Sequence, residues 1–201
     1  MKRICVFCGS NPGFNPVYRE AARELGRLLA GRGLGLIYGG GRVGLMGILA
    51  DAVLEHGGEA IGVIPEQLFA LEVGHNGLTE LRVVRSMHER KASMAELADG
   101  FIALPGGYGT FEEFCEIVTW AQLGLHSKPC GLLNVNGFYD GLLGQLSRAV
   151  GEGFIQPRQR ELVLSGEEPG ELLEKLFAWN PETRGNPAVS GCEPPRPTLE
   201  P

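Results

Sequence analysis

Short apolar runs alternate with longer amphipathic segments along most of this chain. Most of the runs end beside glycine or proline, which is typical of strands buried on both faces of a parallel sheet. The segments between them repeat apolar residues at helical spacing, as at Ala21, Leu25, Leu28 and Leu29. The predicted strands are residues 3–8, 34–38, 59–64, 81–84, 101–104 and 131–135. The predicted helices are residues 17–29, 48–56, 87–98, 111–123 and 138–150.

This alternation predicts an α/β fold with a doubly wound, Rossmann-like and mostly parallel sheet that carries helices on both faces. We expect a single domain over residues 1–179. Residues 180–201 hold six of the 13 prolines and few large apolar side chains, so we expect a disordered tail there. Ligands of such sheets bind outside the carboxyl ends of the strands, where the glycine-rich loops 39–47 and 105–110 fall.

The composition supports a globular domain and narrows its partners. Of the 201 residues, 43% are hydrophobic and 21% are charged, as in ordinary globular proteins. The 31 glycines are about twice the average usage, which suggests backbone that approaches a ligand. A net charge of -6 disfavours nucleic acid as a partner. Without a signal peptide or a run of about eighteen apolar residues, we expect a cytoplasmic protein that does not bind membranes.

The cysteines give no sign of a metal site. There are 5 of them, an odd number, and several lie in apolar stretches where reduced, buried thiols are common. Cys5 and Cys8 form a C-x-x-C pair, but no second pair or histidine cluster supplies the further ligands that zinc needs. We therefore expect neither disulfides nor a bound metal.

The loop 105–110, with the sequence PGGYGT, joins a predicted strand to a predicted helix. A helix N-terminus presents unpaired N–H groups and the positive end of the helix dipole, and glycine lets a phosphate approach the backbone. We predict a phosphate-binding loop here, to which the Thr110 hydroxyl adds a hydrogen bond. The alternative is a tight turn in which Thr110 is only the N-cap of the helix.

Glu113 follows Thr110 by three residues, and this spacing has two interpretations. Thr-x-x-Glu is a capping box, in which the carboxylate folds back onto the N–H of the cap residue. A carboxylate in the first turn of a helix beside a phosphate also lies within reach of the sugar that carries it. The neighbouring Glu112 is a weaker candidate for that position.

The loop 39–47, GGGRVGLMG, contains G-x-G-x-x-G at Gly39, Gly41 and Gly44, and the acidic residue Glu59 lies further on. This spacing suggests a dinucleotide site. However, the motif follows the second predicted strand, and the loop 105–110 is another phosphate-type loop. A mononucleotide contacted by both loops fits equally well.

Residues 87–91, MHERK, open a predicted helix and place two cations next to each other. Arg90 can offer a bidentate fork to an oxyanion or a base edge, whereas Lys91 offers a point charge. The alternative is an exposed and solvated charged face of the helix.

Three motifs in this order resemble the LOG family: GGGxxGLMG at 39–47, MHxRK at 87–91 and PGGxGTxxE at 105–113. The resemblance covers roughly residues 2–176. Members of this family are cytokinin riboside 5'-monophosphate phosphoribohydrolases, formerly labelled lysine decarboxylases. The resemblance implies hydrolysis of N6-modified adenosine 5'-monophosphates, and often of AMP, to the free base and ribose 5-phosphate. It also implies a homodimer and no cofactor or metal.

By motif position, the resemblance assigns catalysis to Arg90 and Glu113. The candidate substrate-binding residues are Gly39, Gly40, Gly41, Glu72, Lys91, Gly107, Tyr108, Gly109, Thr110, Phe111, Glu112 and Thr119. Glycosidic cleavage passes through an oxocarbenium-like sugar, which Glu113 would stabilise while it activates water. Arg90 would stabilise the departing purine. The apolar stretch 117–125 is the candidate dimer interface.

Other functions stay open at this point. A non-enzymatic carrier of a nucleotide or a pterin cofactor would need the glycine loops but not Arg90 and Glu113. A dinucleotide-dependent oxidoreductase would need to bind NAD. A pyridoxal-dependent decarboxylase is disfavoured, because nothing in the sequence marks a Schiff-base lysine or a pocket for the cofactor.

Overall fold

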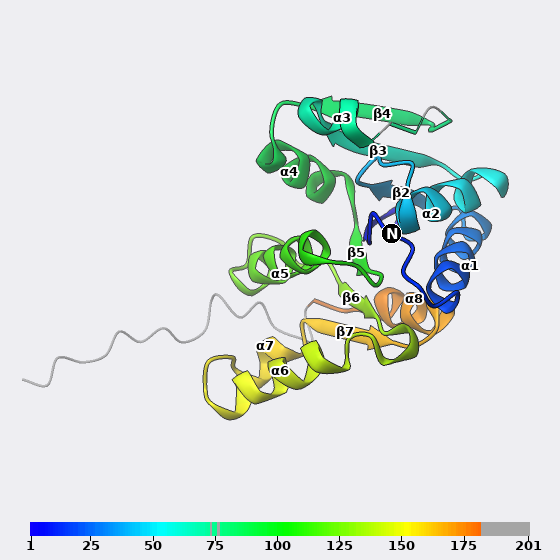
Figure 1. Ribbon diagram of the computed structural model, residues 1–201. Coiled ribbons are helices and arrows are strands. Elements are labelled where there is room, and N and C mark those ends of the chain that lie inside the picture. The colour runs from blue at the N-terminus through cyan, green and yellow to red at the C-terminus, as the bar shows by residue number, and fades with distance from the viewer. Residues whose placement is uncertain (73, 76, 182–201) are drawn as a thin grey trace, which may run out of the picture.

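Seven parallel strands form the central sheet in the spatial order β4-β3-β2-β1-β5-β6-β7 (Figure 1). The computed structural model describes residues 1–72, 74–75 and 77–181. The strands are β1 (Arg3–Phe7), β2 (Gly35–Tyr38), β3 (Ala60–Pro65), β4 (Glu80–Val84), β5 (Gly100–Ala103), β6 (Cys130–Leu133) and β7 (Val163–Gly166). The helices are α1 (Val17–Gly31), α2 (Gly44–Glu55), α3 (Glu66–Glu72), α4 (Met87–Leu97), α5 (Tyr108–Gln122), α6 (Asp140–Gly151), α7 (Pro157–Arg160) and α8 (Pro169–Phe177). The predicted doubly wound α/β fold is confirmed.

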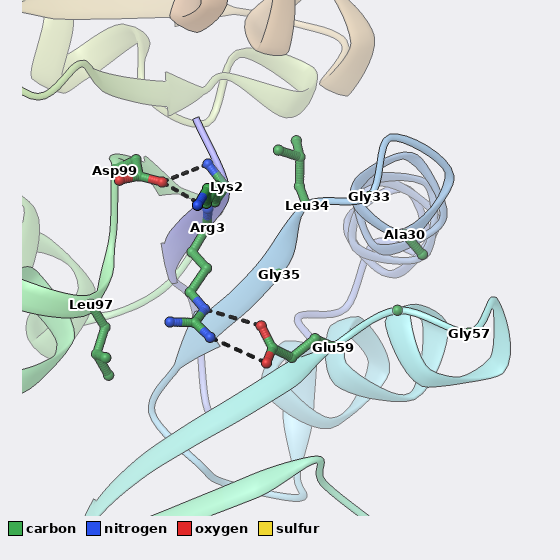
Figure 2. A pocket seen from close by; sticks show the side chains of 11 residues that line it. Lys2, Arg3, Ala30, Gly33, Leu34, Gly35, Gly57, Glu59, Leu97 and Asp99 are labelled. Atoms are coloured by element: carbon green, nitrogen blue, oxygen red, sulfur yellow. Dashed lines mark hydrogen bonds and ion pairs between the residues drawn. The ribbon is translucent and has the colours of Figure 1, made fainter.

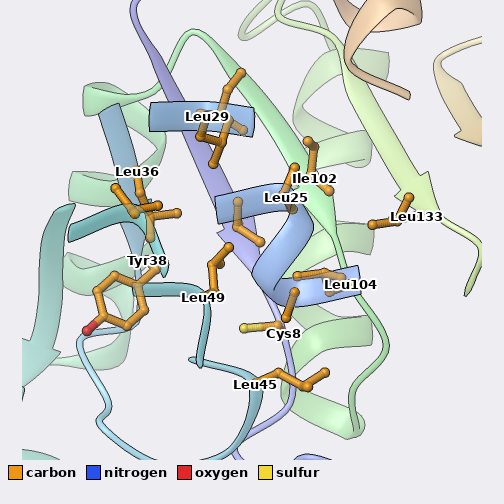
Figure 3. Close-up of a cluster of buried hydrophobic side chains, with 14 of the residues drawn as sticks. Cys8, Leu25, Leu29, Leu36, Tyr38, Leu45, Leu49, Ile102, Leu104 and Leu133 are labelled. Carbon is orange, nitrogen blue, oxygen red and sulfur yellow. The ribbon is translucent and has the colours of Figure 1, made fainter. Parts of the chain in front are cut away.

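The two cores on either side of the sheet explain why the strands are continuous apolar runs. Ile4 and Val6 of β1 pack with residues of α1, α2 and α8 on one face. Cys5 and Phe7 pack with residues of α4 and α5 on the other face. Successive side chains of a strand point to opposite faces, so both sets must be apolar. Figure 3 shows the first core, in which Leu25 of α1 lies against the sheet.

The winding of the sheet reverses at β1. The chain continues to β2, β3 and β4 on one side of β1 and then places β5 on the other side. The Gly9 N–H, after β1, donates to the Pro105 carbonyl, after β5, at 3.1 Å. The Leu45 N–H, at the start of α2, donates to the Gly9 carbonyl at 3.0 Å. Three loops therefore meet at the carboxyl edge of the sheet, at the switch point where ligands of such folds bind.

Two helices begin earlier than the sequence predicts. α2 begins at Gly44 rather than at residue 48, and α5 begins at Tyr108 rather than at residue 111. Glycine disfavours a helix by about 1 kcal/mol, so the pattern placed both starts after the glycines. At the start of α2, the loop after β1 approaches closely, and a Cβ on Gly44 would lie 2.2 Å from the Ser10 carbonyl carbon. Glycine at this position lets α2 start directly against the loop that follows β1.

The structure adds α3, α7, β7 and α8 to the predicted elements. A signal for α8 is present in the sequence, with Pro169 in its first turn and buried Leu172, Leu173 and Leu176 at helical spacing. β7 is an edge strand with two half-buried residues, and such strands give a weaker apolar run.

Three further expectations concern the termini, the membrane and the cysteines. The predicted tail lies outside the described residues, apart from positions 180–181. Within the described ranges, no helix has both the length and the apolar character needed to cross a membrane. Cys5, Cys8 and Cys130 are buried as free thiols. Burial raises the pKa of the Cys130 thiol, which keeps it protonated and unreactive.

The contact between α1 and α2 yields a test of this packing. A Cβ on Gly26 would lie 2.8 Å from both the Ala52 Cβ and the Leu49 carbonyl oxygen, so Gly26→Ala overpacks the contact. We expect Gly26→Ala to lower the free energy of unfolding by about 1–3 kcal/mol in equilibrium urea denaturation. Gly31→Ala, at the end of the same helix with open space around it, is the control, and we expect it to match or exceed the wild type. Equal stabilities of the two variants would contradict the packing.

Candidate active site

The first turn of α4 carries two buried cations to the carboxyl edge of the sheet. The Ser86 hydroxyl accepts a hydrogen bond from the Glu89 N–H at 3.1 Å and so caps the helix. The Glu89 carboxylate in turn accepts from the Arg85 N–H at 2.8 Å. These two bonds fix the helix start, and therefore the directions in which Arg90 and Lys91 point.

Arg90 is a buried guanidinium, 8% exposed, with few partners in the described protein. Its Nη2 donates to the Gly39 carbonyl at 3.4 Å, and its Nη1 contacts the Met87 sulfur at 3.7 Å. Its Nε is buried and has no hydrogen-bond partner among the described residues. A Cβ on Gly39 would lie 2.0 Å from Nη2, so a larger residue here would displace the guanidinium from this position. A buried cation with unused donors is a site prepared for an anion or an electron-rich ligand.

Glu113 of α5 lies opposite Arg90 and is 9% exposed. Its Oε1 is 3.9 Å from Arg90 Nη2, an ion-pair distance that is too long for a hydrogen bond. Burial raises the pKa of the Glu113 carboxyl, although the Arg90 charge opposes this shift. A carboxyl whose pKa is raised towards neutrality is suited to taking up and releasing a proton.

Lys91 makes the tight contacts that Arg90 lacks. Its Nζ donates to Glu112 Oε1 at 2.5 Å and to Glu116 Oε1 at 3.0 Å, and both carboxylates belong to α5. Burial alone would lower the pKa of Lys91, but these hydrogen bonds outweigh it and the pKa is raised. The alternative of an exposed charged face is wrong for Arg90 and Lys91. Glu116 was missed from the sequence, where its only signal is the i, i+4 spacing from Glu112.

The phosphate-type loop lies at the N-terminus of α5, as predicted. Gly107 is the N-cap, and no described side chain caps this end of the helix. Thr110 is therefore the third helical residue, so the alternative in which it is the N-cap, and the capping-box interpretation of Glu113, are wrong. A Cβ on Gly106 would lie 2.1 Å from the Thr110 hydroxyl oxygen and 2.9 Å from the Gly9 nitrogen. Glycine is required at this position for the two loops to approach each other.

A cavity of about 300 Å³ lies between these loops at the switch point. Residues 9–13 and 105–107 line it together with Tyr18, Leu45 and Phe138, whereas Arg90 and Glu113 are not among its lining residues. The rings of Tyr18 and Phe138 meet edge to face, with centroids 5.8 Å apart. The cavity thus combines loops beside a helix N-terminus with an aromatic wall, as small-molecule sites commonly do.

Three further candidate residues, Tyr108, Phe111 and Thr119, also belong to α5. Tyr108 is 95% exposed, whereas Phe111 packs on Phe138 with ring centroids 6.3 Å apart. Thr119 is exposed, and its hydroxyl donates to the Cys115 carbonyl of its own helix at 2.7 Å. No described contact joins it to the Arg90–Glu113 pair.

The glycine loop 39–47 contacts the segment that follows α3. Gly40 accepts a hydrogen bond from the His75 N–H at 3.4 Å, and Gly41 forms an isolated β-bridge with Gly74. Glu72 is the last residue of α3, and its side chain lies outside the described part of the structure.

A larger hollow of about 590 Å³ lies at the opposite, amino edge of the sheet (Figure 2). Its charged residues satisfy one another, since Arg3 Nε donates to Glu59 at 3.0 Å and Asp99 accepts from the Arg3 N–H at 3.0 Å. Glu59 precedes β3 and is far from the carboxyl edge, so it cannot be the ribose-binding acid of a dinucleotide motif. The loop 39–47 therefore lacks the acidic residue that a dinucleotide site requires.

Known proteins share the sequence of this chain over most of its length. A family model described as "Possible lysine decarboxylase" matches residues 46–176. The rice protein named cytokinin riboside 5'-monophosphate phosphoribohydrolase LOG is 53% identical over 181 residues, which cover 90% of this chain and 75% of its own. The Arabidopsis thaliana enzyme LOG7, of the same name, is 52% identical over 90% of this chain and 83% of its own. The chain belongs to the LOG family. The resemblance seen in the three motifs is confirmed.

Solved structures share the fold of this LOG family member at lower identity. The molybdenum cofactor binding protein from Rippkaea orientalis is 23% identical, with a TM-score of 0.67 over 88% of this chain and 96% of its own. A molybdenum cofactor carrier protein from Chlamydomonas reinhardtii is 19% identical, with a TM-score of 0.63 over 89% of this chain and 99% of its own. At such identities, the likeness shows a common fold and carries no statement about the ligand.

The raised pKa of Glu113 predicts a stability difference that depends on pH. The folded state favours the protonated carboxyl, so ionisation of Glu113 costs stability as the pH rises through the raised pKa. Glu113→Gln keeps the neutral form at every pH. We expect this variant to gain stability relative to the wild type as the pH rises from the ordinary pKa of glutamate through the raised pKa, by about 1.4 kcal/mol for each tenfold decrease in the acid dissociation constant. Urea denaturation at several pH values measures the difference in free energy of unfolding between the variant and the wild type. A difference that does not change with pH, or that falls as the pH rises, contradicts the raised pKa.

Proposed function

We propose that this protein hydrolyses the N-glycosidic bond of adenosine 5'-monophosphates, including N6-modified ones, to the free base and ribose 5-phosphate. The observation that carries the proposal is the buried Arg90–Glu113 pair, separated by 3.9 Å beside a helix N-terminus without a side-chain cap. Relatives that are about half identical in sequence are named phosphoribohydrolases, which supports the same reaction class.

The substrate phosphate is bound at the start of α5 in this proposal. The N–H groups of Gly107, Tyr108, Gly109 and Thr110 and the positive end of the helix dipole suit a dianion. Phosphate binding is remote from the bond that breaks, so it supplies binding energy and orientation to the reacting sugar. A nucleoside without phosphate lacks this anchor and is a poor substrate.

The reaction takes place between Glu113 and Arg90. The C1′–N9 bond breaks and leaves its electron pair on N9, while positive charge develops on the sugar. The Glu113 carboxylate stabilises that charge and takes a proton from the water whose oxygen bonds to C1′. The unused donors of Arg90 stabilise the negative charge on the purine, which becomes neutral when it takes up a proton from solvent, and Glu113 returns its proton to solvent. The reaction consumes one water and needs no other reactant.

A pyridoxal-dependent decarboxylation does not fit the lysine at this site. A lysine that forms a Schiff base needs a lowered pKa, so that its neutral amine can attack a carbonyl. Lys91 is bonded to Glu112 and Glu116, and its pKa is raised. The family description as a decarboxylase therefore has no support from this residue.

The proposed enzyme is a cytoplasmic homodimer, as the sequence led us to expect. Leu123 and Leu125, at the end of α5, are 58% and 68% exposed and offer an apolar surface to a second copy. We expect Leu125→Glu to shift the dimer towards monomer by placing a charge in that contact. Sedimentation velocity measures the shift, and an unchanged dimer would move the interface elsewhere.

The function is tested by chromatographic detection of free base. We expect base from AMP and from isopentenyladenosine monophosphate, and none from the matching nucleosides. Glu113→Gln should bind the nucleotide but lower turnover by about 10²-fold or more, because the carboxylate acts on the reacting sugar. Glu96→Gln, which removes an exposed charge from α4, is the matched control and should retain wild-type turnover.

Two results would overturn the proposal. Binding of nucleotide without release of base would indicate a carrier. Release of base by Glu113→Gln at the wild-type rate would show that Glu113 has no catalytic role.

A further inference from the structure

Glu116 is a charged residue at this site that none of the three motifs singles out. It lies one turn after Glu112 on α5, and its Oε1 accepts a hydrogen bond from Lys91 Nζ at 3.0 Å. The Lys91 side chain is 10% exposed and that of Glu116 is 25% exposed, so this contact is largely shielded from water. A shielded ion pair restrains geometry better than an exposed one, because solvent and salt screen it less.

Helix geometry separates this network from the Arg90–Glu113 pair. Consecutive helical residues point about 100° apart, so Arg90 and Lys91 take different directions from α4. Glu112 and Glu116 are four residues apart and both reach Lys91, whereas Glu113 reaches Arg90 from the neighbouring position on the same side of α5. Two bridges therefore join the same two helices: a tight one through Lys91 and a long one between Arg90 and Glu113.

The tight bridge accounts for the length of the long one. The Lys91 ammonium has three N–H donors, and two of them bond to Glu112 and Glu116. With one carboxylate fewer, Lys91 would have an unpaired donor near Glu113 and could turn towards it. A second cation at Glu113 would change the 3.9 Å separation at which Arg90 and Glu113 are now held.

We propose that Glu116 is a positioning residue, which acts through Lys91 to keep Arg90 of α4 and Glu113 of α5 at their 3.9 Å spacing. This inference rests on the proposed function. Glu116 itself contacts neither the sugar nor the phosphate in this account. Its loss affects the reacting pair rather than the anchor at the start of α5.

The charges around Glu113 give a second readout. The groups that face its carboxyl are Arg90 and Lys91 of α4, Glu112 and Glu116 of α5, and the thiols of Cys5 and Cys8. Burial is the main cause of the raised pKa, and the Glu116 charge raises it further. Neutral glutamine at position 116 therefore lowers the pKa of Glu113.

The test compares Glu116→Gln, Glu116→Asp and the control Glu96→Gln with the wild type. We expect Glu116→Gln to lower kcat about tenfold while KM stays within about twofold, because the pair is misplaced and the phosphate site is intact. The acid limb of kcat/KM should move to lower pH. Glu116→Asp keeps the charge but has a shorter reach, so its acid limb should stay in place while kcat falls. Glu96→Gln should match the wild type.

An activity-independent measurement separates this inference from the proposed function. The carbon-13 signal of the Glu113 carboxyl reports its pKa directly, and we expect a lower pKa in Glu116→Gln. If the wild type releases no base, the proposed function fails, whatever the variants show. If the wild type is active and Glu116→Gln has unchanged kcat, acid limb and carboxyl titration, the inference is overturned. Should Glu116→Gln fail to fold, wild-type kcat in Glu116→Asp overturns it instead.

Discussion

Arg90 and Glu113 lie buried beside each other with 3.9 Å between Nη2 and Oε1, and the protein does not close that gap. Removing an ion from water costs about several kcal/mol, and a tight hydrogen-bonded ion pair would partly offset that cost. Arg90 and Glu113 form no such hydrogen bond, so the offset is smaller here. The Gly39 carbonyl holds one end of Arg90, and the carboxylates nearest to Glu113 are bonded to Lys91. The cost is the expected signature of a site in which a substrate completes the interactions.

The fold supplies this arrangement through the reversal at β1. The switch between β1 and β5 opens the carboxyl edge of the sheet, and α4 and α5 flank it on one face. The first turn of α4 contributes the cations and that of α5 contributes the N–H groups. Glycine is required where backbones approach closely, at Gly44 against Ser10 and at Gly106 against Gly9, and Gly39 leaves space for the Arg90 guanidinium. The glycine-rich composition is therefore a consequence of the site as much as of the fold.

Most of the fold could be predicted from the sequence, because apolar periodicity is local and β1, β2, β3, β5 and β6 are largely buried runs. The helix starts at Gly44 and Tyr108 could not, because the low helix propensity of glycine predicts that both helices begin after the glycines. The loops of the site were predicted from glycine spacing. The burial of Lys91 was not, since a charged helix start usually faces water until a second helix covers it. Glu116 became visible only when α5 was placed beside α4.

The most direct test of the account is a crystal structure of the Glu113→Gln variant with AMP bound. The account predicts phosphate oxygens within hydrogen-bond distance of the backbone N–H groups of 107–110. It also predicts that the C1′–N9 bond lies between Arg90 and residue 113. A nucleotide bound in the hollow at the amino edge of the sheet, or with its phosphate on Lys91, would contradict the central claim that the buried pair acts on the glycosidic bond.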